Sequence, residues 1–319
     1  MRRFSDLAEI CRTDEPMSRH TSFRVGGPVR YFLEPRDWDE VDVIYHRCLD
    51  AGLRLRVLGR GCNTLVTDGP HYWAVLSTRQ LNLFSRSGSR LEVGAGYDLT
   101  TLVRRAERWG LAGLEPLAGI PGTVGGAVAM NAGGRDGVIA DHLVSAVVAF
   151  PGQRPHGVSA GELGLAYRGS RLRGGRPLLL SATFELDRGS SRAIEQRRRE
   201  ILARKRASQP TRAWSAGCVF KNPPGDKSAG QLIDECGLKG TRVGGAAVSH
   251  KHANFIVNRG GATADDILRL IDLVAQRVSA EHGIDLELEI EIWDDAPRRA
   301  QGAQGLPNGE ERSGDYGRA

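Results

Sequence analysis

The chain has 319 residues, of which 40% are hydrophobic and 26% are charged, with a formal net charge of +6. This composition excludes a disordered chain and supplies enough apolar side chains for two or three compact units, at roughly 150 residues per domain. The arginines are spread along the chain and no nucleic-acid-binding motif accompanies them, so we expect no nucleic-acid partner.

The cysteines and the apolar segments indicate the cellular compartment of the protein. The five cysteines are far apart and form no CxxC pair, which argues against a disulfide framework and a zinc ribbon. No stretch approaches the roughly 18 apolar residues of a membrane span, and the N-terminal residues lack the apolar segment of a secretory signal. We therefore expect a reduced, soluble, cytoplasmic protein with no membrane partner.

The first half of the chain alternates short apolar runs with glycine-rich turns. Five segments have the apolar character of strands: Leu53–Val57, Ala74–Ser77, Leu91–Val93, Val144–Phe150 and Pro177–Leu186. A helix is expected from Leu99 to Trp109, because its apolar residues recur at helical spacing between an N-cap at Asp98 and a stop at Gly110. These elements suggest a nucleotide-binding α+β region from about residue 20 to 187.

A basic helix is expected next, at about Ser191–Arg206. Its run "RRREILARKR" predicts a solvated helix face rather than a nucleic-acid site. Beyond it, a short helix within Ser228–Gly240 is closed by Gly237, and "HANFIVN", His252–Asn258, predicts a strand. These elements begin a second, smaller unit.

The last elements have clear boundary signals. Thr263 caps a helix with a helical apolar stripe, and Gly283 ends it. The segment "IDLELEIEIW", Ile284–Trp293, alternates apolar and acidic residues, which predicts a strand with one carboxylate-bearing face. The residues after Trp293 are almost free of apolar side chains, so we expect a disordered tail.

Two glycine-rich stretches, Gly59–Asn63 and Gly119–Gly134, are candidates for phosphate binding. Neither is a Walker A motif or a dinucleotide-binding fingerprint. Their small residues would let backbone N–H groups approach a pyrophosphate closely. A tightly packed crossing of two core elements would have the same composition, and the residues alone leave both interpretations open.

The stretch "SAGCVFKNP", Ser215–Pro223, contains a thiol whose role the residue types leave open. Cys218 has the chemistry of a nucleophile, a metal ligand, a proton donor or a core residue. A thiol hydrolase would need a histidine and an orienting amide, which "HKHAN" supplies without a recognisable hydrolase context. His250 and His252 have no third ligand at sensible spacing, and their period-two placement at a strand start explains them, so we expect no metal.

Eight segments, taken together, resemble one enzyme family. They are "HTSFRVGGPVRYFLEP" (20–35), "GRGCNTLV" (59–66), "LEPLAGIPGTVGGAVAMNAGG" (114–134), "YRGSRL" (167–172), "SAGCVFKNP" (215–223), "AGQLIDECGLKG" (229–240), "GGAAVSHKHANFIVN" (244–258) and "LELEIEIW" (286–293). In this order they are similar to the UDP-N-acetylenolpyruvoylglucosamine reductase family over about residues 18–293.

The resemblance implies an α+β fold, in which a two-subdomain FAD-binding domain of the vanillyl-alcohol-oxidase (PCMH) type is followed by a smaller α+β substrate-binding domain. The expected division is an N-terminal extension 1–19, an FAD-binding domain 20–187 split near residue 75, a linking basic helix 188–211, a substrate-binding domain 212–294 and a disordered tail 295–319.

The resemblance also implies an activity. A monomeric enzyme with non-covalent FAD would use NADPH to reduce the enolpyruvyl ether of UDP-N-acetylglucosamine to UDP-N-acetylmuramate for peptidoglycan. The alternatives are another FAD-dependent oxidase or dehydrogenase on the same fold, the thiol hydrolase, and a basic RNA-binding protein.

The family's site residues can be carried over by position. Arg168 would be the cation that stabilises negative charge, Glu289 its carboxyl partner and Cys218 the proton donor; from the residues alone, Arg168 and Glu289 would be assigned to solvated surface groups. The FAD-binding residues would be Gly59, Arg60, Gly61, Cys62, Asn63, Thr64, Leu65, Gly122, Thr123, Gly125, Gly126, Asn131, Ala132 and Gly133. The substrate-binding residues would be Tyr167, Arg206, Lys221, Asn222 and His252.

The chain departs from the family's most familiar form at two cysteines. Serine is common at the positions of Cys62 and Cys218, and the short spacing before "SAGCVF" suggests the shorter subclass of the family. A thiol donates a proton only while it is protonated, and its ordinary pKa is about 8.5. Arg168 or Lys221 would lower this pKa and Glu289 would raise it. The sequence leaves the balance open.

Overall fold

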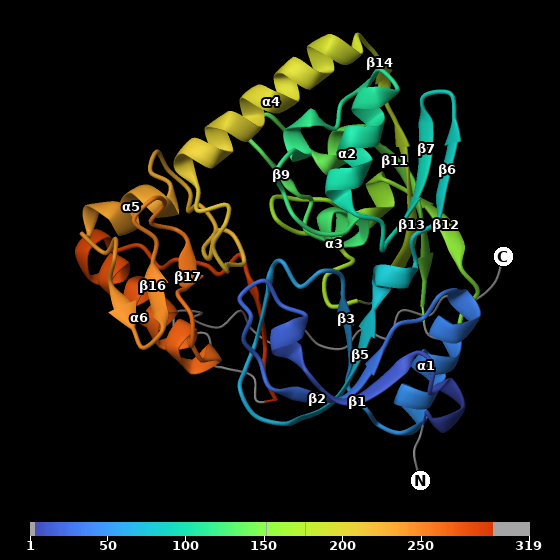
Figure 1. The fold of residues 1–319 in the computed structure, drawn as a ribbon, viewed down its shortest axis with the longest axis horizontal. Helices are drawn as coiled ribbons and strands as arrows, with labels where there is room; N and C mark the ends of the chain where they lie inside the picture. The colour runs from blue at the N-terminus through green and yellow to red at the C-terminus, as the bar shows by residue number, and fades with distance from the viewer. Residues whose placement is uncertain (1–3, 151, 176, 296–319) are drawn as a thin grey trace, which may run out of the picture.

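A computed structural model describes residues 4–150, 152–175 and 177–295, which form three α+β units (Figure 1). The tail expected at 295–319 lies outside the described residues, apart from Asp295. The first unit contains a four-stranded sheet, the second a five-stranded sheet and the third a three-stranded sheet.

The first sheet has the strand order β1-β2-β5-β3. Its strands are β1 (Cys11–Pro16), β2 (Pro28–Leu33), β3 (Leu55–Leu58) and β5 (His71–Ser77). β1 is antiparallel to β2, and the other neighbours are parallel. Alternate residues of β5 enter different cores: Leu76 packs with helix α1 (Trp38–Asp50), and Val75 packs on the opposite face with Trp293. The sheet therefore includes β1, which lies in the segment expected to be an N-terminal extension.

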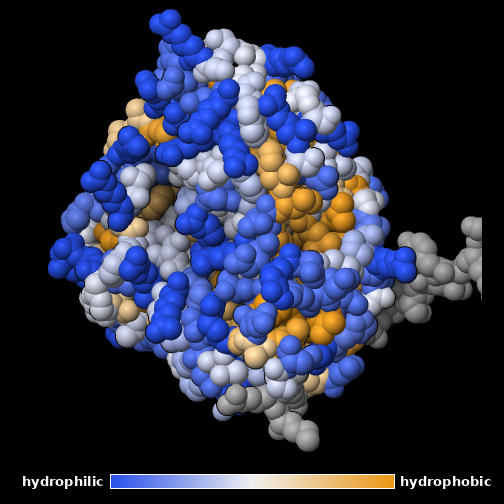
Figure 2. All heavy atoms as spheres, turned by 45° about the vertical axis from the view of Figure 1, so that its right-hand side comes forward, coloured by the Kyte–Doolittle hydropathy of each residue, from blue (hydrophilic) through white to orange (hydrophobic). Residues whose placement is uncertain are grey.

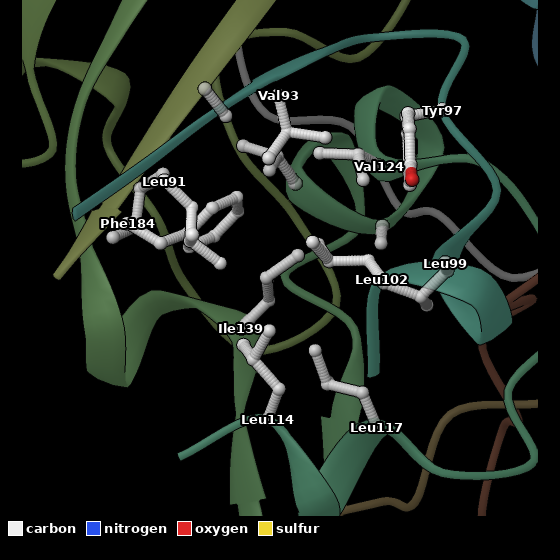
Figure 3. Packing of buried hydrophobic residues seen from close by; sticks show 14 of the residues in the cluster. Leu91, Val93, Tyr97, Leu99, Leu102, Leu114, Leu117, Val124, Ile139 and Phe184 are labelled. Carbon is white, nitrogen blue, oxygen red and sulfur yellow. The ribbon is translucent and has the colours of Figure 1, made fainter. Parts of the chain in front are cut away.

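The second sheet is antiparallel, with the order β12-β11-β13-β7-β6. Its strands are β6 (Phe84–Ser87), β7 (Arg90–Gly94), β11 (Leu143–Ala149), β12 (His156–Ser159) and β13 (Leu178–Glu185). Helices α2 (Leu99–Arg108) and α3 (Val124–Ala129) pack on it. Figure 3 shows Leu102 and Val124 of these helices among Val93 and Phe184 of the sheet. This packing fixes the start of α3, and with it the second glycine-rich stretch.

The signals read from the sequence account for several helix ends. The Asp98 side chain accepts a hydrogen bond from the Thr101 N–H and caps α2, and Gly110 adopts the left-handed conformation beyond it. In the third unit, the side chains of Ser228 and Thr263 cap α5 (Ala229–Glu235) and α6 (Ala264–His282). Gly283 ends α6 with a φ of 67°.

The third unit joins a small sheet to α5 and α6. Its strands are β15 (Arg242–Val243), β16 (Ala246–Val248) and β17 (Ile256–Asn258). Its core also contains Phe23, Val25 and Leu65 from the first unit, so the two units share buried apolar surface. The basic helix α4 (Ser191–Ser208) runs from the second unit to the third and buries only Ile194 and Ile201 (Figure 1).

Three two-stranded pairs complete the structure. They are β9 (Gly133–Gly134) with β10 (Gly137–Val138), β8 (Leu111–Ala112) with β14 (Asp187–Arg188), and β4 (Thr64–Val66) with β18 (Glu291–Trp293). The strand expected over 284–293 is thus wrong in extent, because regular pairing with β4 begins only at Glu291. Before that point the chain makes a single bridge, between Leu288 and Phe220.

The surface is polar over most of the face shown in Figure 2, with apolar side chains in smaller patches. In the described part of the chain, no helix has the length and apolarity that crossing a membrane would require.

Candidate active site

A cleft of about 1000 Å³ lies where the three units meet. Most of the expected FAD-binding residues line it: Gly59, Arg60, Gly61, Cys62, Asn63, Thr64, Gly122, Thr123, Gly125, Gly126, Ala132 and Gly133. The three expected catalytic residues, Arg168, Cys218 and Glu289, line it as well. Segments far apart in the sequence thus meet at one cavity large enough for a dinucleotide and a second ligand.

The two glycine-rich stretches lie against each other in the wall of this cleft. A Cβ at Gly59 would come within 2.6 Å of the Thr123 hydroxyl, so only glycine permits this approach. Arg60 is paired with Asp98, and Asp98 forms a backbone bridge with Thr123. Part of the glycine content therefore serves the packing of one subdomain on the other, which was one of the two interpretations open from the sequence.

The same stretches also have the features of a phosphate site. The N–H groups of Gly61, Cys62 and Asn63 donate no hydrogen bond within the described part of the chain, and Gly61 has a φ of 63°. A Cβ at Gly122 would meet no atom within 4 Å, so this residue borders open space in the cleft. Unpaired N–H groups around a left-handed glycine suit a pyrophosphate, so these residues fit FAD.

Gly61→Ala is expected to destabilise the protein more than Gly52→Ala. Both glycines have φ near 60°, which costs a non-glycine residue about 1–2 kcal/mol. At Gly61 a Cβ would also lie 2.1 Å from the His20 carbonyl oxygen, whereas at Gly52 it meets nothing within 4 Å. We expect a cost on the order of 3 kcal/mol or more at Gly61, together with loss of FAD. Thermal unfolding and flavin absorbance measure both effects, and equal losses in the two variants would contradict the steric argument.

Two expected FAD-binding residues lie behind the cleft wall. Leu65 is fully buried in β4 and belongs to the core of the third unit. Asn131 is 9% exposed and has a φ of 42°; its side chain donates to the Ala166 carbonyl and accepts from the Ala140 N–H. Both residues support the loops that face the cleft.

Arg168 and Glu289 form a close ion pair in the cleft. The Arg168 Nε lies 2.8 Å from Glu289 Oε1, and the side chains are 19% and 16% exposed. Arg168 has a φ of 54°, within a tight turn closed by Ala166 and Gly169, and its Nη2 donates to the Gly133 carbonyl. Burial raises the pKa of Glu289, and Arg168 opposes that rise. The strained backbone at Arg168 aims a cation at the glycine-rich wall.

Cys218 lies beside this ion pair, and its protonation state follows from its surroundings. Burial is the largest cause and the charge of Glu289 the second, and together they raise the pKa of the Cys218 thiol to about 12. Arg168 only partly opposes this shift. The thiol is therefore protonated at neutral pH. The balance that the sequence left open favours Glu289 over Arg168, and Lys221 is not among the causes.

The backbone around Cys218 is held by Asn254, a residue that sequence reasoning missed. Asn254 is 3% exposed; its side chain accepts from the Phe220 N–H and donates to the Phe220 carbonyl, and its own carbonyl accepts from the Val219 N–H. The Glu289 N–H donates to the Val219 carbonyl at 2.8 Å. Asn254 thus positions the segment that presents Cys218 and Glu289.

Four of the expected substrate-binding residues surround the cleft without lining it. Lys221 is paired with Glu287 at 3.0 Å, and the Asn222 side chain accepts from the Ala229 N–H at the start of α5. Tyr167 is 58% exposed, and its hydroxyl accepts from the Asn222 N–H. His252 packs edge-on against Phe255, and its Nδ1 accepts from the Asn254 N–H. These contacts are internal to the protein.

The last substrate-binding candidate, Arg206, is exposed outside the cleft, and its neighbour Lys205 takes the inward position. The Lys205 ammonium donates to the Ala118 carbonyl at 2.6 Å, just before the second glycine-rich stretch. Burial lowers its pKa to about 8. The prediction of a solvated helix face holds for only part of α4, because Lys205 of this basic run points into the cleft.

Two family models match the chain. A model described as an FAD binding domain matches residues 29–152, and one described as the C-terminal domain of UDP-N-acetylenolpyruvoylglucosamine reductase matches residues 209–293. The fold and the glycine-lined cleft therefore define an FAD-dependent oxidoreductase.

Relatives and a solved structure agree over nearly the whole chain. UDP-N-acetylenolpyruvoylglucosamine reductase 2 of Symbiobacterium thermophilum is 42% identical over 287 residues, covering 90% of this chain and 93% of its own. The corresponding reductase of Moorella thermoacetica is 45% identical over 282 residues, with 88% and 92% covered. The crystal structure of the reductase (MurB) from Thermus caldophilus is similar with a TM-score of 0.77 and 40% identity, over 89% of this chain and 100% of that one. The chain belongs to the UDP-N-acetylenolpyruvoylglucosamine reductase family.

These matches confirm the family resemblance, the α+β fold class with an FAD-binding part followed by a smaller domain, and FAD as the cofactor. The roles of the individual site residues stay predictions.

Proposed function

We propose that the protein reduces the enolpyruvyl ether of UDP-N-acetylglucosamine to UDP-N-acetylmuramate, with NADPH as the electron donor, in peptidoglycan synthesis. The observation that supports this best is the half-buried grouping of Arg168, Glu289 and a protonated Cys218 in a cleft walled by the expected FAD-binding loops. A cation, a carboxyl group and an acid are the groups that addition of a hydride and a proton to an enol ether requires.

The residues 59–64 and 122–133 would hold the FAD pyrophosphate through backbone N–H groups. When bound, FAD supplies a hydride to the methylene carbon of the enolpyruvyl group. The wall at Gly122 leaves room for a ligand next to the glycine-rich loops.

Arg168 and Glu289 act on the substrate carboxylate. Negative charge builds up on the α carbon and its carboxylate as the methylene is reduced, and Arg168 stabilises it in a partly desolvated site. Glu289 has a raised pKa because it is buried. Its protonated form can donate a hydrogen bond to the substrate carboxylate, and its charged form keeps Arg168 in place.

Cys218 supplies the proton. Its S–H bond breaks as the α carbon takes the proton, which leaves a thiolate that Arg168 stabilises and that solvent reprotonates. A raised pKa keeps the donor protonated before each turnover.

The direct test is NADPH oxidation by the FAD-loaded protein with UDP-N-acetylenolpyruvoylglucosamine. Substrate-dependent oxidation with UDP-N-acetylmuramate as product is the expected result. If the rate of NADPH oxidation did not depend on this substrate, the proposal would be contradicted and another oxidase on the same fold would be favoured.

Lys205→Met is expected to raise KM for the UDP substrate by about 10–100-fold, whereas Arg206→Met should leave it nearly unchanged. We propose that Lys205, not Arg206, is the cation near the substrate diphosphate, because, of these two neighbours, Lys205 lines the cleft and Arg206 does not. Since its pKa is lowered to about 8, the ammonium is charged below that pH and neutral above it. KM of the unaltered enzyme should therefore rise above about pH 8 and that of Lys205→Met should not. An equal effect of both substitutions would contradict this assignment.

We also propose that the enzyme is a cytoplasmic monomer that acts on a UDP-sugar without a nucleic-acid partner. In this proposal the residues 20–187 hold the flavin in two subdomains, 212–294 close over the substrate, and the basic helix in 188–211 links these two domains.

A further inference from the structure

A cluster of metal-ligand types lies away from the cleft, where the C-terminal ends of α5 and α6 meet. Cys236 directly follows α5, and Glu281 and His282 are the last two residues of α6. One ligand atom from each of the three lies within 4.8 Å of the others, and no other such group occurs in residues 4–150, 152–175 and 177–295.

His282 has a buried nitrogen that the protein leaves without a hydrogen bond. Its Nε2 is inaccessible to solvent and has no hydrogen-bond partner, although Glu235 Oε2 lies 3.8 Å away. A buried polar atom of this kind is costly and calls for a physical explanation. If the cluster were only the polar rim of two packed helices, this nitrogen would be expected to have a partner.

The surroundings of the cluster favour positive charge. The C-terminal end of α6 carries the negative end of its dipole, and Glu235 and Glu281 add carboxylates. Lys227 and Arg277 each approach one of the carboxylates from outside, at 2.8 Å, which leaves each carboxylate a second oxygen.

We propose that Cys236, Glu281 and His282 form a zinc site, with Glu235 or a water molecule as the fourth ligand. Thiolate, imidazole and carboxylate are the ligands that zinc combines in tetrahedral sites, whereas magnesium and calcium prefer oxygen alone. Binding replaces the thiol proton of Cys236, which passes to solvent, and gives the His282 Nε2 the partner that it lacks.

The metal would join the ends of α5 and α6. At the opposite end of α5, the Ala229 N–H donates to the side chain of Asn222, four residues after Cys218, so zinc would stiffen the helix on which the cleft segment rests. The role is structural and independent of the proposed reaction.

Cobalt binding to the chelator-treated, FAD-loaded full chain tests the site. Cobalt(II) should bind at one equivalent and give a thiolate charge-transfer band in the near ultraviolet. Zinc should displace it and raise the thermal unfolding midpoint. Cys236→Ser should abolish the band and weaken zinc binding at least about tenfold, and Cys11→Ser, a thiol outside the cluster, should change neither.

His282→Gln provides a second variant should Cys236→Ser fail to fold. It removes the ligand nitrogen from a less buried side chain, and it should also weaken zinc binding at least about tenfold with unchanged flavin absorbance. Absence of stoichiometric zinc binding by the unaltered protein, or binding that His282→Gln leaves intact, would overturn the proposal.

Discussion

A Cys218→Ala variant is expected to keep its flavin and to accept hydride from NADPH, yet to lose about 10²–10⁴-fold in turnover of the enolpyruvyl substrate. The thiol is the one predicted proton donor beside the Arg168–Glu289 pair, and alanine leaves the backbone bonds of the segment in place. Stopped-flow measurement of the two half-reactions separates the effects. Flavin reduction by NADPH should be normal, and flavin reoxidation by the substrate should be slow.

Cys218→Ser is the matched control for this prediction. A hydroxyl is a weaker acid than a thiol but is fully protonated at working pH, so substantial turnover should remain. If Cys218→Ala turned over substrate as fast as Cys218→Ser, Cys218 would not be the proton donor. A slow NADPH half-reaction in Cys218→Ala would instead indicate a perturbed flavin site.

The helices were predictable because their signals are local. Asp98, Ser228 and Thr263 each cap the helix that follows, as the residue types indicated. Gly283 ends α6 in the left-handed conformation that glycine favours. Each of these features involves residues within one or two turns of one another, so the sequence carries the information directly.

The final strand shows what local sequence signals do not predict. The alternation over 284–293 is real, but only Glu291–Trp293 finds a strand partner, in β4. The contact that fixes this crossing, from the Asn63 side chain to the Glu289 carbonyl, joins residues 226 positions apart. A period-two pattern specifies which side chains share a face and does not specify where a partner strand begins or ends.

Predicting which residues belong to the site also required knowledge of long-range contacts. Glu287, Glu289 and Glu291 are equivalent in the alternating pattern, yet Glu287 is 77% exposed and paired with Lys221, whereas Glu289 is 16% exposed and paired with Arg168. Only the family resemblance singled out Glu289 in advance. Lys205 went unnoticed within a run of cations, because nothing in the run marks the one that faces inward.

Glu289→Gln is expected to lower turnover by about 10²–10³-fold and, at the same time, to accelerate alkylation of Cys218 by iodoacetamide. The carboxylate charge helps to raise the pKa of Cys218, and Arg168 lowers it. Removing the carboxylate leaves Arg168 unopposed, so the pKa falls and a larger fraction of thiolate is present at a fixed, mildly alkaline pH. Burial, the largest cause of the shift, stays, so the pKa should remain above that of a free thiol. Peptide mapping by mass spectrometry after timed alkylation measures the rate at Cys218 alone.

Glu287→Gln is the matched control, since it neutralises an exposed carboxylate two residues away that does not contact Arg168. It should leave both turnover and the alkylation rate of Cys218 within about twofold of the unaltered enzyme, as is usual for an exposed ion pair. Unchanged flavin absorbance in Glu289→Gln distinguishes the electrostatic argument from general damage, because a disordered site would also slow turnover and expose Cys218 to the reagent. Alkylation that is slower in Glu289→Gln than in the unaltered enzyme would mean that Glu289 does not help to keep the Cys218 thiol protonated.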